Sequence, residues 1–137
     1  MRKAFMCCYL ATPGAVGIAR KAAELAVLGW GVHRGTADDV GLVVSELLTN
    51  AVRACPHTEV RVAVEWSAPD AVTVEVWDSS PRRPVERRPA GIDEGGPDDP
   101  GGRGLGIVQA LARHCGSRPD GNGKTVFAVI GVGGPVR

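Results

Sequence analysis

The chain has almost no net charge and no long apolar run, and each absence excludes a class of function. Sixteen Lys and Arg residues are balanced by fifteen Asp and Glu residues, so the formal net charge is +1. This balance gives no electrostatic footprint for nucleic acid or for an anionic membrane surface. No apolar stretch approaches the length of a membrane-spanning helix. We therefore expect neither direct nucleic-acid binding nor membrane insertion.

Paired cysteines and clustered histidines are also lacking. The four cysteines and three histidines do not follow the spacing of zinc sites. Free thiols in a small core-forming domain indicate a reducing compartment, so we expect a cytoplasmic protein without a structural metal. The start, Met1–Leu10, is basic and then apolar like a signal peptide, but its apolar part is short and we predict a first strand there.

What is present is the composition of one globular domain. The chain has 137 residues, 44% of them apolar, which is enough for a single core. After a strand at 4–10, Thr12 is predicted to cap a helix that opens with Pro13 and ends near Gly29. Thr36 is predicted to cap a second helix that stops before Pro56. Asp38 and Asp39 are predicted to lie in the first turn of this helix, where its dipole favours negative charge.

The second half of the chain predicts an antiparallel hairpin, a helix and a final strand. Valine alternates with other residues at 60–65 and again at 72–77, and a turn lies between these two strands. A third helix is predicted at 104–114 and a last strand at 124–132. The segment at about 79–103 holds five of the ten prolines and interrupts the domain, so we interpret it as a functional lid loop.

Two polar residues project from the second helix beside its apolar stripe. Glu46 and Asn50 are four residues apart, so their side chains lie next to each other. The amide oxygen of Asn suits a hard cation such as Mg²⁺, and a Glu carboxylate can accept a proton from a hydroxyl. A pair of solvated residues on an amphipathic helix is the alternative interpretation, because such pairs are common.

Two further segments carry candidate ligand groups. Asp78 ends the second hairpin strand and could accept a hydrogen bond from the amino group of a heterocycle, or it could simply cap a turn. The glycine-rich segment 101–107 opens the third helix and could bring backbone N–H groups to phosphates, or it could be a flexible hinge. It matches neither a Rossmann fingerprint nor a P-loop.

The order of these segments resembles the GHKL, or Bergerat-fold, ATPase superfamily, and within it the small bacterial anti-sigma-factor serine/threonine kinases. Residues 46–53 resemble the N-box of this family, 102–106 its second glycine box and 123–127 its terminal strand. The resemblance covers nearly the whole chain as one ATP-binding domain, 1–137. It departs at Ser80, where the broader family has a glycine that gives adenine room.

The resemblance implies a two-layer α/β sandwich, in which a mixed, mostly antiparallel sheet is covered on one face by about three helices. It also implies a site for ATP and Mg²⁺. Asn50 would ligate Mg²⁺, Glu46 would be the catalytic base, and Asp78 would accept from the adenine amine, with Thr125 assisting through a water. Backbone groups around Gly104, Leu105 and Gly106 would hold the phosphates, within a box that includes Gly102 and Arg103. Arg53 would approach the phosphates or remain a surface residue.

The function that the resemblance implies is phosphorylation of a serine or threonine on an anti-sigma-factor antagonist. A sigma factor would be the second protein partner, and a homodimer is expected only because relatives dimerise. Two alternatives stay open. The domain could be a non-catalytic ATP-binding module that regulates a partner through lid closure, or a scaffold without nucleotide, because Ser80 and Pro81 could close the adenine site.

Overall fold

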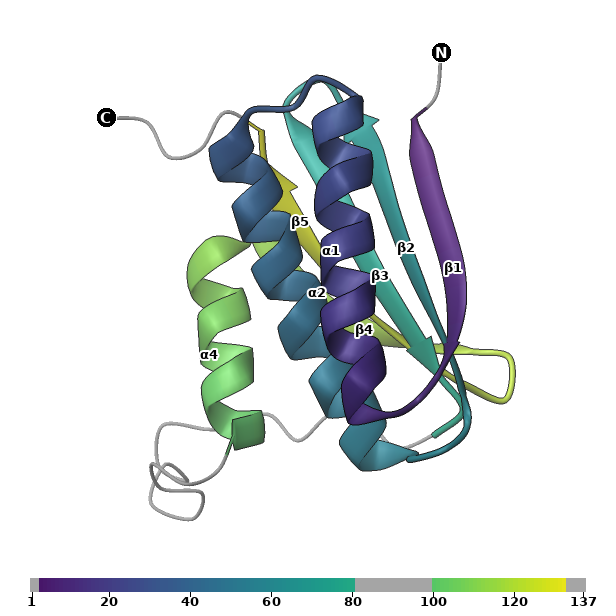
Figure 1. Cartoon of the computed structure of the whole chain (residues 1–137). Helices are drawn as coiled ribbons and strands as arrows, with labels where there is room; N and C mark the ends of the chain where they lie inside the picture. Colours follow the sequence, from purple (N-terminus) through teal and green to yellow (C-terminus); the bar gives the residue numbers. More distant parts are fainter. Residues whose placement is uncertain (1–2, 81–99, 133–137) are drawn as a thin grey trace.

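The computed structural model describes residues 3–80 and 100–132 (Figure 1). Eight elements follow one another along these residues. They are β1 (Ala4–Leu10), α1 (Pro13–Gly29), α2 (Arg34–Ala54), β2 (Glu59–Ala68), β3 (Ala71–Asp78), α4 (Pro100–Leu111), β4 (His114–Asp120) and β5 (Gly123–Gly131).

The five strands form one sheet in the order β1-β2-β3-β5-β4. Every pair of neighbours in this sheet is antiparallel. Figure 1 shows α1, α2 and α4 lying side by side on one face of the sheet. The predicted two-layer sandwich is therefore confirmed, with a sheet that is antiparallel throughout its described strands.

The core lies between the sheet and the three helices. The alternating valines of β2 and β3 point into it, and all of them are at most 1% exposed: Val60, Val62, Val64, Val72, Val74 and Val76. The apolar stripe of α2 faces them and is likewise buried, with Val40, Val44 and Leu48 at 0% exposure. Burial of these side chains fixes which face of each strand and helix turns inward, and so which residues remain for a site.

The first helix begins as predicted, but the second begins earlier. The Thr12 hydroxyl accepts from the Ala15 N–H at 3.3 Å, with Pro13 in the first turn of α1. In α2 the cap is His33, whose Nδ1 accepts from the Gly35 N–H at 3.0 Å. The prediction that Thr36 caps this helix is wrong, because Thr36 lies inside the first turn and is completely buried.

The strand β4 was not predicted. The sequence pattern extended the third helix to His114, whereas α4 ends at Leu111 and the Arg113 N–H then donates to the Val129 carbonyl at 2.7 Å. β4 lies at the edge of the sheet, where a strand needs only one apolar face and tolerates Pro119. Its sequence therefore lacks the alternation by which β2 and β3 are found.

The predicted loop at 79–103 ends earlier than expected, because α4 already begins at Pro100. Residues 81–99 of that loop, including Pro81, lie outside the described part of the chain, so the lid interpretation stays a prediction. Within 3–80 and 100–132, none of the helices combines the length and the apolar character needed to span a membrane.

Candidate functional site

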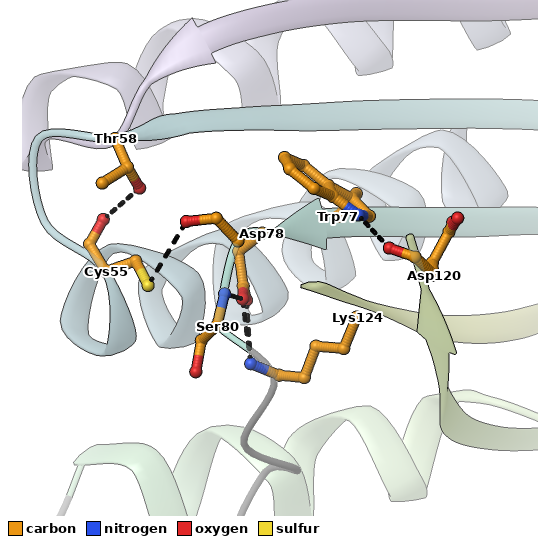
Figure 2. Close-up of polar contacts among 8 residues, drawn as sticks. Cys55, Thr58, Trp77, Asp78, Ser80, Asp120 and Lys124 are labelled. Atoms are coloured by element: carbon orange, nitrogen blue, oxygen red, sulfur yellow. Dashed lines mark hydrogen bonds and ion pairs between the residues drawn. The ribbon is translucent and has the colours of Figure 1, made fainter. Parts of the chain in front are cut away.

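The carboxylate of Asp78 is buried at the end of β3 and is held by two neighbours. Asp78 is 1% exposed. Lys124, its cross-strand partner on β5, places Nζ 3.0 Å from both carboxylate oxygens. The Ser80 N–H donates to Oδ1 at 2.8 Å, so Asp78 also caps the turn that follows it (Figure 2). Asp78 therefore caps a turn, as one of the two interpretations predicted, whereas its role as acceptor for a heterocycle stays a prediction.

A second set of contacts joins the end of α2 to the end of β3. The Ser79 hydroxyl donates to the Cys55 Sγ at 3.6 Å, and the Thr58 hydroxyl donates to the Cys55 carbonyl at 2.7 Å (Figure 2). Cys55 follows Asn50 by five residues, which corresponds to about 7.5 Å along a helix axis. The contacts of Cys55 therefore place the polar end of α2 in the same region of the molecule as Asp78.

Three of the predicted site residues share one face of α2. Glu46, Asn50 and Arg53 are separated by four and three residues, so they follow one another on the helix surface beside the buried stripe. Glu46 and Asn50 are half-buried, and Arg53 is exposed. Among the described residues, neither Glu46 nor Asn50 has a hydrogen-bond or ion-pair partner. Their polar atoms are therefore available to a ligand.

Asp39 lies on the same face of α2, seven residues before Glu46. Burial raises the pKa of the Asp39 carboxyl, and the charge of Asp38 raises this pKa further. Both residues lie in the second turn of α2, not in its first turn as the sequence predicted, because the helix begins at Arg34. They therefore gain less from the helix dipole than expected, since that effect fades beyond the first turn.

The raised pKa of Asp39 predicts a pH-dependent gain in stability from Asp39→Asn. A carboxyl that binds its proton more tightly in the folded state destabilises the fold as pH rises from its ordinary pKa, 3.8, through the raised value. We expect Asp39→Asn to unfold at higher urea than wild type at pH 7, by up to about 1 kcal/mol, with the difference shrinking toward pH 4.

The matched control for this prediction is Asp38→Asn. It should give a smaller gain, because burial outweighs the neighbouring charge as the cause of the shift. Equal gains from both substitutions, or a loss of stability from Asp39→Asn at pH 7, would contradict the assignment.

The glycine-rich segment is helical and forms the first turns of α4. Gly102, Arg103, Gly104, Leu105 and Gly106 all lie inside the helix, which begins at Pro100 and not at Gly104. The first N–H groups of a helix have no partner within it, and Pro100 has no N–H. In a helix that begins at Pro100, the N–H groups of residues 101 and 102 have no partner within the helix, whereas those of 104–106 fall within the helical hydrogen-bonding pattern.

Thr125 is not brought together with Asp78. Its hydroxyl donates to Asp120 Oδ2 at 2.7 Å. The Trp77 indole N–H donates to the Asp120 carbonyl at 2.9 Å (Figure 2). Successive strand residues point to opposite faces, so Thr125 and Trp77 lie on the face away from Lys124 and Asp78. Lys124, which the sequence reasoning assigned no role, occupies the place beside Asp78.

Gly123 allows β5 to start against the end of β3. A Cβ at this position would overlap the Asp78 carbonyl oxygen and lie 2.8 Å from the Ser79 Cα. We expect Gly123→Ala to cost about 1–3 kcal/mol in urea unfolding, because backbone atoms must move apart. A Cβ on Gly17, in the second turn of α1, would meet nothing within 4 Å. Gly17→Ala should therefore stabilise by about 0.5–1 kcal/mol. Equal changes in the free energy of unfolding for Gly123→Ala and Gly17→Ala would contradict the close approach of β5 to the end of β3.

The described part of the chain contains no group of three or more His, Cys, Asp or Glu residues that could hold a metal ion. A cage of protein ligands is therefore not the kind of site that these residues form. Mg²⁺ in phosphate sites commonly keeps several waters and takes only one or two ligands from the protein. The Glu46–Asn50 pair suits that kind of coordination.

Comparison with known families supplies the observation that decides the family. The sequence model of the histidine kinase-like ATPase domain matches residues 9–130, which include the three helices and nearly all of the sheet except most of β1. This chain belongs to the histidine kinase-like ATPase family. Membership implies an ATP-binding domain, and the match includes Glu46, Asn50 and Asp78 within its range. The predicted resemblance to this superfamily is confirmed.

A solved structure shares the fold at low identity. The crystal structure of the RsbU and RsbW domains of Rv1364c from Mycobacterium tuberculosis superposes with a TM-score of 0.70 and 18% sequence identity. The alignment covers 98% of this chain and 34% of that one, so this histidine kinase-like ATPase chain spans about a third of its length. A search of curated proteins gives no match.

Proposed function

We propose that this chain is a Mg-ATP-binding regulatory protein that transfers the γ-phosphoryl group of ATP to a serine or threonine of a protein substrate. The observation that carries the proposal is the pair Glu46–Asn50, unpartnered among the described residues, on a helix whose end is joined to the Asp78 segment. Family membership supports ATP as the ligand of the domain, and we assign the ligand to that region.

The donor set on α2 fits a magnesium ion that is shared with phosphates. Asn50 would offer its amide oxygen as the protein ligand, and its half-buried position limits competition from water. When bound, Mg²⁺ would neutralise charge on the phosphates, which is a main requirement of phosphoryl transfer. The part played by the protein is then chiefly to position ATP and the attacking hydroxyl.

Glu46 is the residue that favours transfer over binding alone. Its carboxylate lies one helical turn before Asn50, so it would face a hydroxyl that approaches the phosphate end of the nucleotide. It would orient that hydroxyl and accept its proton. A module that only binds nucleotide does not require a carboxylate at this place.

The base and the phosphates of the nucleotide have further candidate partners, on the sheet and on α4. Asp78 would accept a hydrogen bond from the exocyclic amine of adenine. Because this carboxylate is buried, few waters would compete for it. Free N–H groups in the first turn of α4 would hold the phosphates, and those of 104–106 would join them if that turn opens. Thr125 would reach the base only after leaving Asp120, so its assisting role stays a prediction.

The protein substrate that we propose is an anti-sigma-factor antagonist, with a sigma factor as a second partner, on the basis of the resemblance to the anti-sigma-factor kinases. A homodimer is proposed on the same basis. Large apolar side chains are exposed on β1 (Met6 and Leu10) and on α1 (Ile18 and Leu25) and are available for protein contacts.

Labelled ATP tests the proposal directly. The purified chain is incubated with γ-labelled Mg-ATP and with candidate antagonists, and label on serine or threonine is located by mass spectrometry. Transfer that disappears when EDTA removes the metal supports the kinase. Clear nucleotide binding without transfer to any candidate would favour the alternative function, a non-catalytic module that regulates a partner through ATP-dependent closure.

A further inference from the structure

We propose that Lys124 competes with the nucleotide base for the Asp78 carboxylate and thereby sets the affinity of the site for ATP. This inference rests on the proposed function, because it takes Asp78 as the acceptor for the base. Lys124 belongs to the Gly-Lys-Thr sequence that opens β5, and the proposed phosphoryl transfer leaves it without a task.

The contacts of Lys124 cover the acceptor. Nζ lies 3.0 Å from both Oδ1 and Oδ2, and the Ser80 N–H takes a further position on Oδ1. A carboxylate offers about four acceptor positions, so one on Oδ2 is left. The side chains of Asp78 and Lys124 are only 2% and 7% exposed. The remaining acceptor position is therefore shielded from solvent together with the ion pair, and under this proposal a base gains access to Asp78 only when the ammonium leaves.

The two competitors differ in charge. An ammonium compensates the carboxylate charge fully in this buried place, whereas the amine of adenine is a neutral donor and compensates it only in part. The binding-competent state is the one in which Lys124 has left Asp78, and the apparent affinity is reduced by the fraction of molecules in that state. Lys124 can leave because its flexible side chain can carry the ammonium to water, where it is strongly hydrated.

The rest of the site does not share this competition. Glu46 and Asn50 lack partners among the described residues, so metal and phosphates would meet them without first breaking an ion pair. The competition acts on the base alone. It therefore distinguishes nucleotides bound through Asp78 from phosphate-containing ligands without a base, such as Mg-pyrophosphate.

The first test is the affinity of Lys124→Met for Mg-ATP, measured by calorimetry beside wild type. Met keeps the length of the side chain and removes the charge. We expect binding at least about tenfold tighter, since the competing ammonium is gone, with the affinity for Mg-pyrophosphate unchanged. Arg118→Met is the matched control, because it removes a cation from the Arg118–Glu75 pair, 3.2 Å apart, on the other face of the sheet. Its affinity should equal that of wild type. Unchanged or weaker ATP binding by Lys124→Met would overturn the proposal.

The second test uses wild-type protein and does not depend on the folding of a variant. Lysine acetylation followed by mass spectrometry compares Lys124 with Lys21, whose side chain is 71% exposed. Without nucleotide, Lys124 should react much more slowly than Lys21. Saturating Mg-ATP should raise the rate at Lys124 severalfold and leave that at Lys21 unchanged. If Lys124 stays protected in the complex, the ion pair persists and the proposal is wrong.

Failure of the proposed function and failure of the proposed Lys124 competition give different experimental results. If neither wild type nor Lys124→Met binds Mg-ATP, the proposed function fails. If both bind Mg-ATP equally, the proposed function stands and only the competition is refuted. If wild type binds Mg-ATP too weakly for calorimetry and Lys124→Met binds it well, the result supports both the proposed function and the competition.

Discussion

Asn50→Ala is expected to abolish Mg-dependent ATP binding, with a loss of affinity of at least about a hundredfold. Asn50 is the only protein ligand for Mg²⁺ that we assign, and a site that takes one or two protein ligands has little to replace a lost one. Calorimetry with ATP in the presence and absence of Mg²⁺ measures the effect. Wild type should lose affinity when the metal is removed, whereas Asn50→Ala should bind equally weakly with and without it.

Loss of folding would not explain this result. Alanine has a higher helix propensity than asparagine, and among the described residues Asn50 has no hydrogen bond or ion pair that the substitution would break. Thr49→Ala is the matched control, because Thr49 precedes Asn50 on α2 and is also half-buried. It should bind Mg-ATP like wild type. An Asn50→Ala variant that keeps full Mg-dependent affinity would remove the metal assignment.

Glu46→Gln is expected to keep ATP binding within about threefold of wild type and to lose phosphoryl transfer by about 10²–10⁴-fold. The amide keeps the size and most hydrogen-bonding geometry of the side chain but cannot accept the proton of the attacking hydroxyl. The loss expected for removing a general base lies in this range. Single-turnover transfer of label from γ-labelled ATP to a candidate antagonist measures the step apart from binding.

A separate outcome distinguishes the roles of the two α2 residues. If Glu46→Gln transfers phosphate at the rate of wild type, Glu46 is not the base and the case for a kinase weakens. If it loses binding as well as transfer, Glu46 takes part in holding the metal. Only a loss of transfer with binding retained agrees with the assignment made here.

Much of the fold follows from patterns that burial imposes directly. The valine alternation of β2 and β3 and the stripe of α2 arise because each element has one inward face, and those faces are buried as predicted. Thr12 was found because a hydroxyl before Pro13 is a strong helix-start signal. His33 and β4 were missed, because a ring nitrogen can replace a hydroxyl cap and an edge strand needs little apolar alternation.

The site residues, like the elements of the fold, divide into those that a local sequence pattern predicts and those that depend on contacts between distant segments. Glu46 and Asn50 could be paired from sequence because helical spacing alone makes them neighbours. The Asp78–Lys124 ion pair joins residues 46 positions apart and depends on the register of β3 with β5. No local pattern encodes that register. The assisting role of Thr125 beside Asp78 came from the resemblance, whereas the alternation of β5 turns Lys124 toward Asp78 and Thr125 away from it.

The contact between Cys55 and Ser79 had no sequence signal at all. It links the residue that follows α2 with the residue that follows β3, and each lies in a turn whose course depends on the packing of the whole helix layer. The sequence therefore predicts the chemical groups of the site better than the contacts that bring them together.

Calorimetric titration of the wild-type chain with ATP in the presence of Mg²⁺ tests the central claim most directly, with a thermal-shift measurement on the same samples. We predict saturable heat, a rise in the unfolding temperature with ATP concentration, and loss of both when EDTA is added or Asn50 is replaced by alanine. Neither heat nor a thermal shift, from wild type and from Lys124→Met alike, would contradict the assignment of an ATP site to this chain.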